Sequence, residues 1–267
     1  MAGLRDVPAH WLTSEGITKG MDIVCHESAL SISISDGSGF VFPLGMTMRT
    51  PGMDKELVIG LLFSEGIIDD FSQISEIQIL NDDILVIIPS LDEKNMSEFQ
   101  RRISSTSSCG VCGKDSISNL LHIHGPELSE DVLIKSSVIN DSIEELRKKQ
   151  SIFQKTGGAH ASGLFDLNGK LLFIAEDIGR HNAMDKLVGS IISKSPEIFS
   201  KSFILFSGRL SFELVHKARR AGIPVLVAIG APSSLAIDIA LEHGLTLVGF
   251  AKNNNMTVYS GRGRISH

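Results

Sequence analysis

The first third of the chain alternates apolar and polar residues in short runs. Residues 21–35 alternate loosely, as a half-buried strand does, and an apolar run resumes at residues 40–42 after the turn Asp36-Gly37-Ser38-Gly39. Apolar positions over residues 57–63 have the spacing of a short buried helix that a glycine would end. Two further apolar runs flank Asn81-Asp82-Asp83 and predict a second hairpin. This part of the chain is therefore predicted to be a small α+β unit.

From residue 130 onward, short apolar runs alternate with segments of helical periodicity. This alternation is typical of a mostly parallel sheet whose strands are joined by right-handed helical crossovers. A charged helix is predicted first, over residues 141–150. Strands are then predicted at 171–175, 203–206, 225–229 and 245–250, and helices at 182–192, 212–220 and 234–243. The second half is therefore predicted to be an α/β domain.

A polar and basic segment, residues 97–108, separates these two halves and has little to bury. Such segments usually run over the protein surface. We therefore predict three parts: a small α+β domain over residues 18–104, a mobile CxxC loop over residues 105–115, and a larger α/β domain over residues 116–267.

Composition narrows the class of protein. The chain is 42% hydrophobic and 21% charged, which is ordinary for a globular protein, and its net charge of −6 argues against a protein that coats nucleic acid. The first residues lack the design of a signal peptide, and no apolar stretch is long enough to span a bilayer. We therefore expect a cytoplasmic protein without a membrane partner.

The cysteines are the first candidates for chemistry. The chain has three, of which Cys25 is isolated on a predicted strand and is expected to be an inert core thiol. Cys109 and Cys112 form a CxxC pair, which can bind a metal, cycle through a disulfide or carry sulfur as a persulfide. A sulfur carrier needs an accessible thiolate, and Lys114 and the start of a helix after Gly113 both favour the anion.

The other two uses of the pair are less well supported. A thioredoxin-type site requires the pair to follow a strand, whereas serine and threonine precede it here. A structural zinc site lacks a second ligand pair, but a catalytic zinc held by Cys109, Cys112 and His160 stays open. A zinc deaminase would need a glutamate two residues after the histidine, and Ser162 stands there instead.

The predicted strands end in residues that favour anions. Carboxyl ends of parallel strands meet at one sheet edge, and helices that begin there present unpaired N–H groups to a ligand. Arg180, His181 and Arg209 add donors and charge at this edge, and His160 lies among three glycines nearby. The same glycines and serines could simply cap helices, with His160 a hydrogen-bonded core residue. No GxxxxGK[ST] pattern is present, so we predict binding of a nucleotide-like anion without ATP hydrolysis.

The chain also resembles a known family, the formate dehydrogenase accessory sulfurtransferases of the FdhD type. The resemblance covers most of the chain and is specific as a set, although CxxC alone would not be. It rests on Met48-Arg49-Thr50-Pro51-Gly52, Ser64-Glu65-Gly66-Ile67, Ser108-Cys109-Gly110-Val111-Cys112-Gly113, Thr156-Gly157-Gly158-Ala159-His160, the stretch from Glu176-Asp177 to Lys186, Ser207-Gly208-Arg209, and Ala231-Pro232-Ser233-Ser234-Leu235-Ala236.

This resemblance implies a sulfur carrier that receives sulfur from a cysteine desulfurase and passes it to the molybdenum cofactor, bis-molybdopterin guanine dinucleotide, before insertion into formate dehydrogenase. It implies that the large domain is a three-layer, cytidine-deaminase-like α/β sandwich, that Cys109 carries the persulfide and Cys112 assists, and that the protein is a homodimer. The alternative is a chaperone that only holds the cofactor.

The predicted cofactor site includes the strand ends described above. The family resemblance implies that the loop of residues 250–255 also belongs to it. GDP is expected to mimic the guanine nucleotide part of the cofactor. The last loop, residues 250–255, is less basic than the family pattern suggests. No resident metal is predicted. The predicted cofactor-binding residues are His160, Arg180, His181, Asn182, Ser207, Arg209, Ala231, Pro232, Ser233, Phe250, Ala251, Lys252, Asn253, Asn254 and Asn255.

Overall fold

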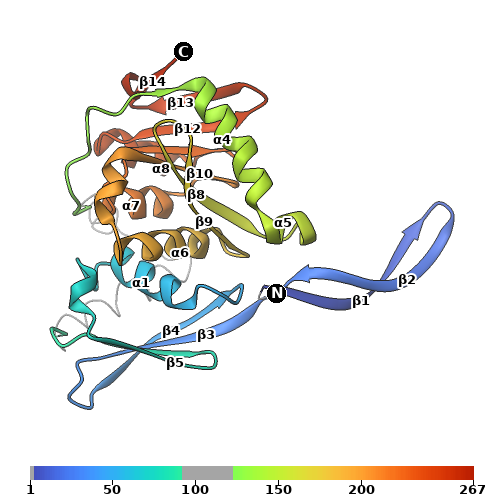
Figure 1. The fold of residues 1–267 in the computed structure, drawn as a ribbon, viewed down its shortest axis with the longest axis horizontal. Coiled ribbons are helices and arrows are strands. Elements are labelled where there is room, and N and C mark those ends of the chain that lie inside the picture. The colour runs from blue at the N-terminus through green and yellow to red at the C-terminus, as the bar shows by residue number, and fades with distance from the viewer. Residues whose placement is uncertain (1–2, 92–122) are drawn as a thin grey trace.

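The chain begins with a long two-stranded hairpin that projects from the rest of the molecule (Figure 1). The structure, a computed structural model, describes residues 3–91 and 123–267. Strands β1 (Leu4–Thr13) and β2 (Gly16–Cys25) pair antiparallel in an unbroken register. The single strand predicted over residues 21–35 is wrong, because β2 ends at Cys25 and β3 starts at Ser28. The domain boundary predicted at residue 18 falls inside β2.

A four-stranded sheet follows, with the strand order β4-β3-β6-β5. Every second residue of β3 points to the core, so Leu30, Ile32 and Ile34 are buried, and helix α1 supplies further residues of the same core cluster. The predicted helix and both predicted hairpin turns are confirmed. The elements are β3 (Ser28–Ser35), β4 (Val41–Arg49), α1 (Asp54–Ser64), the 3₁₀ helix η1 (Phe71–Gln73), β5 (Glu76–Leu80) and β6 (Asp83–Ile87).

The second half forms a six-stranded sheet in the order β13-β12-β11-β10-β8-β9. Strands β10, β11 and β12 are parallel, and β8 and β13 run antiparallel to their neighbours. Every residue of β10 and β11 is buried, which explains their continuous apolar runs. All four strands predicted in this half are confirmed. The six are β8 (His160–Asp166), β9 (Leu171–Asp177), β10 (Ser202–Phe206), β11 (Val225–Ala228), β12 (Thr246–Lys252) and β13 (Asn255–Ser260).

Helices cover both faces of this sheet. Apolar residues of α6, α7 and α8 share one core cluster with one face, and those of α4 share a second cluster with the other face. The predicted helices are confirmed to within a few residues, and among the described residues no helix is both long and apolar enough to span a membrane. The remaining elements are β7 (Ile134–Lys135), α4 (Ser136–Lys149), α5 (Ser151–Thr156), α6 (Arg180–Ile192), η2 (Pro196–Lys201), α7 (Phe212–Arg220), α8 (Ser234–Glu242), η3 (Arg262–Arg264) and β14 (Ile265–Ser266).

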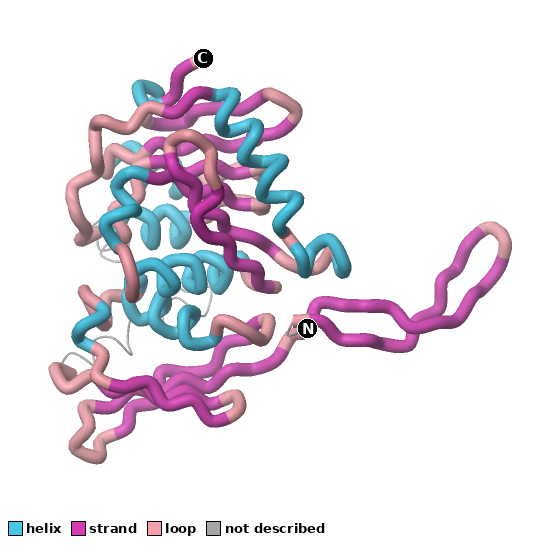
Figure 2. The backbone as a smooth tube through the Cα atoms, in the orientation of Figure 1, coloured by secondary structure: helices cyan, strands magenta, loops and turns pink. Residues whose placement is uncertain are grey.

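The two halves share one hydrophobic core. Figure 2 shows α1 and α6 side by side between the two sheets, and one cluster of buried residues includes side chains from both helices and both sheets. Glycines allow the close approach, because a Cβ on Gly60 would lie 1.9 Å from the carbonyl oxygen of Asp185. A Cβ on Gly189 would lie 1.9 Å from the carbonyl oxygen of Glu56. The predicted large domain thus rests on the small sheet through a tight helix pair; its likeness to the cytidine deaminase fold stays a prediction.

Candidate functional site

The strand ends meet at one edge of the large sheet, as predicted. Because β8 runs opposite to β9 and β10, its first residue, His160, lies at the carboxyl ends of the other strands, directly opposite Asp177. Ser207 follows β10, and its hydroxyl accepts a hydrogen bond from the N–H of Ala161 at 2.9 Å. Gly208 lies against the histidine ring, since a Cβ there would be 3.1 Å from Nδ1 of His160. The structure therefore brings His160 and Ser207 together.

Positive charge gathers around His160. Burial lowers the pKa of His160, and the nearby charges of Arg180, Arg209 and His181 lower it further, while Asp177 opposes them. The imidazole is therefore held neutral at neutral pH, where one of its ring nitrogens can accept a hydrogen bond. The Nε atom of Arg180 is buried and has no hydrogen-bond partner within the described chain. A buried donor without a partner is costly, so this atom suits an anionic ligand at the edge.

His181 faces the start of α7. Its Nε2 atom lies 3.0 Å from Oγ of Ser211 and 3.7 Å from a carboxylate oxygen of Glu213. Burial alone would raise the pKa of Glu213, but the neighbouring side chains of His181 and Ser211 outweigh this and lower the pKa to about 2. Both side chains touch the same imidazole nitrogen, so the three residues do not form a serine-hydrolase triad, in which the acid contacts the other nitrogen.

The loops after β10 and β11 lie against each other. The N–H of Leu210 donates to the carbonyl of Ala231 at 3.1 Å, and the N–H of Ser233 donates back to the carbonyl of Leu210 at 2.9 Å. Ser233 also caps α8, because its hydroxyl accepts from the N–H of Ala236. These bonds place Arg209, Ala231, Pro232 and Ser233 along the edge that His160 begins.

The residues of the predicted last loop, 250–255, lie in three different environments. The N–H of Phe250 donates to the carbonyl of Gly230 at 3.1 Å, which joins this residue to the site edge, and 44% of Phe250 is exposed. Ala251 is fully buried in the core on the α4 side of the sheet. Asn253 and Asn254 both have positive φ and form the tight turn between β12 and β13, flanked by the pair Lys252 and Asn255. Only Phe250 of this loop has a hydrogen bond that ties it to the neighbouring strand ends.

Asn182 supports the site instead of lining it. Its side-chain amide donates to the carbonyl of Met48 at 2.8 Å and to Oδ1 of Asp177 at 3.1 Å. Both amide hydrogens are therefore engaged within the protein. The prediction that Asn182 contacts a cofactor has no support from this geometry.

Residues that the sequence did not single out hold this support in place. Thr50, Asp177 and Lys186 form a buried cluster in which Nζ of Lys186 lies 2.7 Å from Oδ2 of Asp177. Lys186 also donates to the carbonyl of Thr50 at 2.7 Å. The only signal in the sequence was that all three residues fall within the stretches on which the family resemblance rests.

Cys109, Cys112 and Lys114 lie outside the described residues, and so does the predicted mobile loop. Cys25 is only half-buried, with its sulfur 3.2 Å from Oγ1 of Thr50, so the expected core position is wrong. Among the described residues, no group of three or more histidine, cysteine or acidic side chains could hold a metal ion.

A surface hollow without this chemistry lies elsewhere. It has a volume of about 620 Å³ and is lined by α4 and the first residues of β9, at the opposite end of that strand from Asp177. Its rim consists of Asp141, Glu145, Lys149 and Lys170, without the unpaired cationic donor found beside His160. The chemistry at the strand ends, and not the size of the hollow, identifies the candidate site.

Comparisons with known proteins agree with the family resemblance. The model of the FdhD/NarQ family matches residues 25–266. A sulfur carrier protein FdhD of Thermoplasma acidophilum is 38% identical over 258 residues, covering 96% of this chain and 91% of the relative. One of Saccharolobus solfataricus is 42% identical over 218 residues, covering 82% of each. A crystal structure from Desulfotalea psychrophila, assigned as a formate dehydrogenase accessory protein, matches with a TM-score of 0.76 at 25% identity, covering 98% of this chain and 99% of that one.

Proposed function

The chain belongs to the FdhD/NarQ family, and we propose that it carries sulfur from a cysteine desulfurase to the molybdenum cofactor of a formate dehydrogenase. A general sulfur-carrier role is supported by relatives at 38% and 42% identity over most of the chain. The donor, the acceptor and the persulfide intermediate are the parts that we propose.

The CxxC pair supplies the transfer chemistry in this proposal. The thiolate of Cys109 attacks the outer sulfur of the desulfurase persulfide, so a new S–S bond forms at Cys109 while the desulfurase thiolate leaves. Attack of the Cys112 thiolate on the Cys109 sulfur then forms a disulfide and releases the carried sulfur as hydrosulfide. A dithiol reductant restores both thiols. Hydrosulfide is a soft anionic ligand of the kind that a molybdenum centre takes up.

The strand edge supplies the cofactor site in this proposal. Bis-molybdopterin guanine dinucleotide is a substrate here, and its phosphates need planar cationic donors and helix amino termini. The single observation that carries this part is the buried, unpartnered Nε atom of Arg180, with Arg209 and the neutral His160 close by. Ser207, His181 and the residues 231–233 complete the edge, and Phe250 adds an exposed aromatic ring beside it.

The test of this site is a GDP titration by calorimetry. We expect the parent to bind GDP and Arg209→Ala to bind it at least tenfold more weakly, because a charge-assisted hydrogen bond to phosphate is lost. Lys149→Ala, on the distant face of α4, is the matched cationic control and should bind GDP as the parent does. Equal affinities of Arg209→Ala and the parent would reject this site.

The alternative function is a chaperone that binds the cofactor without carrying sulfur. Complementation of a strain that lacks the endogenous gene separates the two: the carrier predicts that Cys109→Ala fails to activate formate dehydrogenase, whereas the chaperone predicts full activation. We also propose a homodimer in the cytoplasm, which sedimentation and cell fractionation would test.

A further inference from the structure

One buried carboxylate joins the small sheet to the beginning of α6. The Oδ2 atom of Asp177 accepts from the N–H of Thr50 at 3.0 Å and from Nζ of Lys186 at 2.7 Å. Its Oδ1 atom accepts from the N–H of Gly179 at 2.8 Å and from the amide of Asn182 at 3.1 Å. The side chain of Asp177 is 0% exposed, so the four donors replace the water that an ionised carboxylate would otherwise bind.

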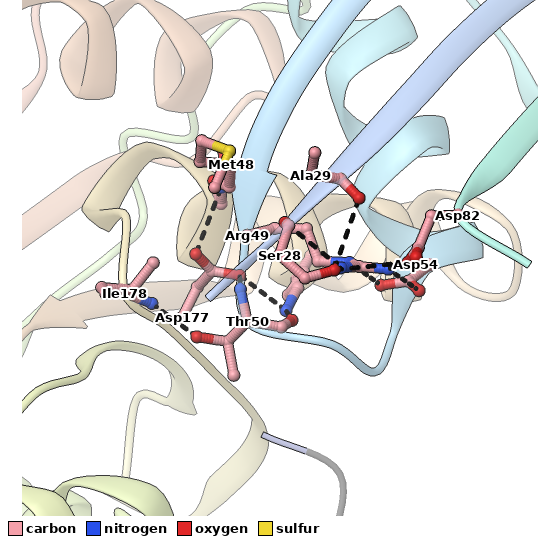
Figure 3. A network of polar contacts seen from close by, with 11 residues as sticks. Ser28, Ala29, Met48, Arg49, Thr50, Asp54, Asp82, Asp177 and Ile178 are labelled. Carbon is pink, nitrogen blue, oxygen red and sulfur yellow. Dashed lines mark hydrogen bonds and ion pairs between the residues drawn. The ribbon is translucent and has the colours of Figure 1, made fainter. Parts of the chain in front are cut away.

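Each polar group of Thr50 makes a hydrogen bond with Asp177, Ile178 or Lys186. Besides the N–H that it donates to Asp177, its carbonyl accepts from Lys186 at 2.7 Å. Its Oγ1 atom accepts from the N–H of Ile178 at 3.0 Å. Thr50 is 1% exposed and follows the last residue of β4. It therefore acts as a bridge between the two sheets, with Asp177 and Ile178 on the other side (Figure 3).

Contacts of Arg49 within the small domain hold the adjacent Thr50 in place. The guanidinium of the preceding residue, Arg49, is 2% exposed and donates to Asp54 at 2.9 Å and to Asp82 at 2.7 Å. It also donates to the hydroxyl of Ser28. These contacts anchor the end of β4 to α1, β3 and the turn before β6. Thr50 is consequently held on a rigid base, as a group that positions others must be.

The segment that Thr50 holds leads directly into the candidate site. The backbone N–H groups of Ile178 and Gly179 donate hydrogen bonds to the side chains of Thr50 and Asp177, and the next two residues are Arg180 and His181. We propose that Thr50 is a positioning residue, which orients Arg180 and His181 toward the ligand by fixing the backbone of residues 178–179. This inference rests on the proposed function, because the ligand is the guanine nucleotide part of the cofactor.

A second buried cluster on α6 offers a matched control. Asp185 pairs with Lys217 of α7 at 2.7 Å and accepts from the hydroxyl of Ser64 at 2.9 Å. This cluster ties α6 to α1 and α7, and these side-chain bonds of Asp185, Lys217 and Ser64 do not involve the side chains of residues 177–181. Loss of the Ser64 hydroxyl should therefore destabilise the protein without moving Arg180 or His181.

The experiment compares full-length Thr50→Val, Thr50→Ser and Ser64→Ala. Valine keeps the shape of threonine and removes only the hydroxyl, whereas serine keeps the hydroxyl. We expect GDP affinity to fall about fivefold to tenfold in Thr50→Val, as for the loss of one buried hydrogen bond, and to recover in Thr50→Ser. Ser64→Ala should lower the melting temperature similarly but bind GDP as the parent does. Unchanged affinity in Thr50→Val would overturn the proposal.

A second measurement keeps this inference separate from the proposed nucleotide site. Amide hydrogen exchange of the ligand-free protein reports the opening of residues 178–183 directly. Exchange there should be faster in Thr50→Val than in Thr50→Ser or Ser64→Ala. Failure of the parent to bind GDP would reject the nucleotide part of the proposed function, and exchange would still decide the positioning role. Equal exchange at residues 178–183 in all variants would overturn it.

Discussion

The Nζ atom of Lys186 lies 2.7 Å from Oδ2 of Asp177, and neither side chain is more than 1% exposed. The residue before it, Asp185, points the other way and pairs with Lys217 at 2.7 Å. Two neighbouring residues of α6 therefore pair with opposite charges on two different elements. One pair ties α6 to β9 and Thr50, and the other ties it to α7, so α6 is the element through which the site is attached to the rest of the protein.

Removing the charge of Lys186 should be strongly destabilising. Lys186→Met leaves Asp177 buried without its cationic partner, which typically costs about 3–5 kcal/mol of unfolding free energy. The matched control is Lys149→Met, because Lys149 and Glu145 form an exposed pair at 3.9 Å whose loss costs about 0.5 kcal/mol or less. Urea denaturation of both variants measures the difference. Equal midpoints would show that the buried pair does not stabilise the fold.

The contact between α1 and α6 should tolerate no side chain at Gly60. An alanine usually stabilises a helix relative to glycine by about 1 kcal/mol, but here its Cβ would lie 1.9 Å from a carbonyl oxygen of α6. The helices must separate, so we expect Gly60→Ala to destabilise the protein by about 3 kcal/mol or more.

Gly263→Ala is the control for this prediction, since no atom lies within 4 Å of a Cβ at that position. Thermal unfolding should give the control a melting temperature close to that of the parent. A Gly60→Ala protein as stable as the control would mean that the helices do not cross as closely as described.

Acid should destabilise the protein through His216. Burial, together with the smaller effects of the charges of Lys217, Arg220 and His243, lowers the pKa of His216 to about 4. Between the unfolded pKa of about 6.5 and the folded pKa of about 4, the unfolded chain binds a proton that the folded chain does not. The unfolding free energy therefore decreases as the pH decreases through this range. His216→Gln removes this titration, so the parent should lose about 2 kcal/mol more than the variant between pH 7 and pH 5.

The measurement for His216 is urea denaturation at a series of pH values. His10→Gln on the exposed hairpin is the control and should follow the pH dependence of the parent. Parallel curves for the parent and His216→Gln would show that His216 does not titrate in this window.

Glu213 should also destabilise the protein as the pH falls, but in a lower pH range than His216. Its pKa is lowered to about 2, so its ionised form stabilises the fold above the unfolded pKa of about 4.5. This stability is lost as the pH falls from about 4.5 through about 2. Because Glu213 is partly exposed, solvent screening limits the effect to about 1 kcal/mol. Glu213→Gln should therefore lower the unfolding free energy at pH 7 and do so less at pH 3.

Glu144→Gln is the matched control for Glu213, since its carboxylate lies in an exposed helix pair with Arg147. Denaturation curves of this control should follow the parent at both pH values. An equal loss of stability in Glu213→Gln at pH 7 and pH 3 would contradict the role given to the Glu213 carboxylate.

The sequence predicted the elements whose residues are buried in a regular pattern. The apolar strand β10 and the helix α6 are examples, because burial on both faces leaves a continuous apolar run and burial on one stripe leaves helical spacing. Strand β8 was missed because Gly163 lies within it and Gly157 and Gly158 precede it. Gly163 lies within this strand where a Cβ would be 2.7 Å from Leu146, so packing and not turn formation requires it.

The hairpin β1–β2 was missed for a different reason. Most of its side chains are exposed, so neither strand has the alternation that burial imposes. For the site, the positions of Arg180, His181 and Arg209 followed from the predicted parallel strands, whose carboxyl ends meet at one edge of the sheet. The contact of Thr50 with Asp177 did not, because 127 residues separate them and no local pattern connects a threonine to a buried carboxylate.

The most direct test of sulfur transfer is the intact mass of the protein after incubation with a cysteine desulfurase and cysteine. Parent, Cys109→Ala, Cys112→Ala and Cys25→Ala should be compared before and after treatment with a thiol reductant. We predict one added sulfur atom, removable by the reductant, on Cys112→Ala, in which release from Cys109 is blocked, and none on Cys109→Ala. The parent and Cys25→Ala should behave alike. A Cys112→Ala protein without the added sulfur, or an unchanged adduct on Cys109→Ala, would contradict sulfur transfer through Cys109.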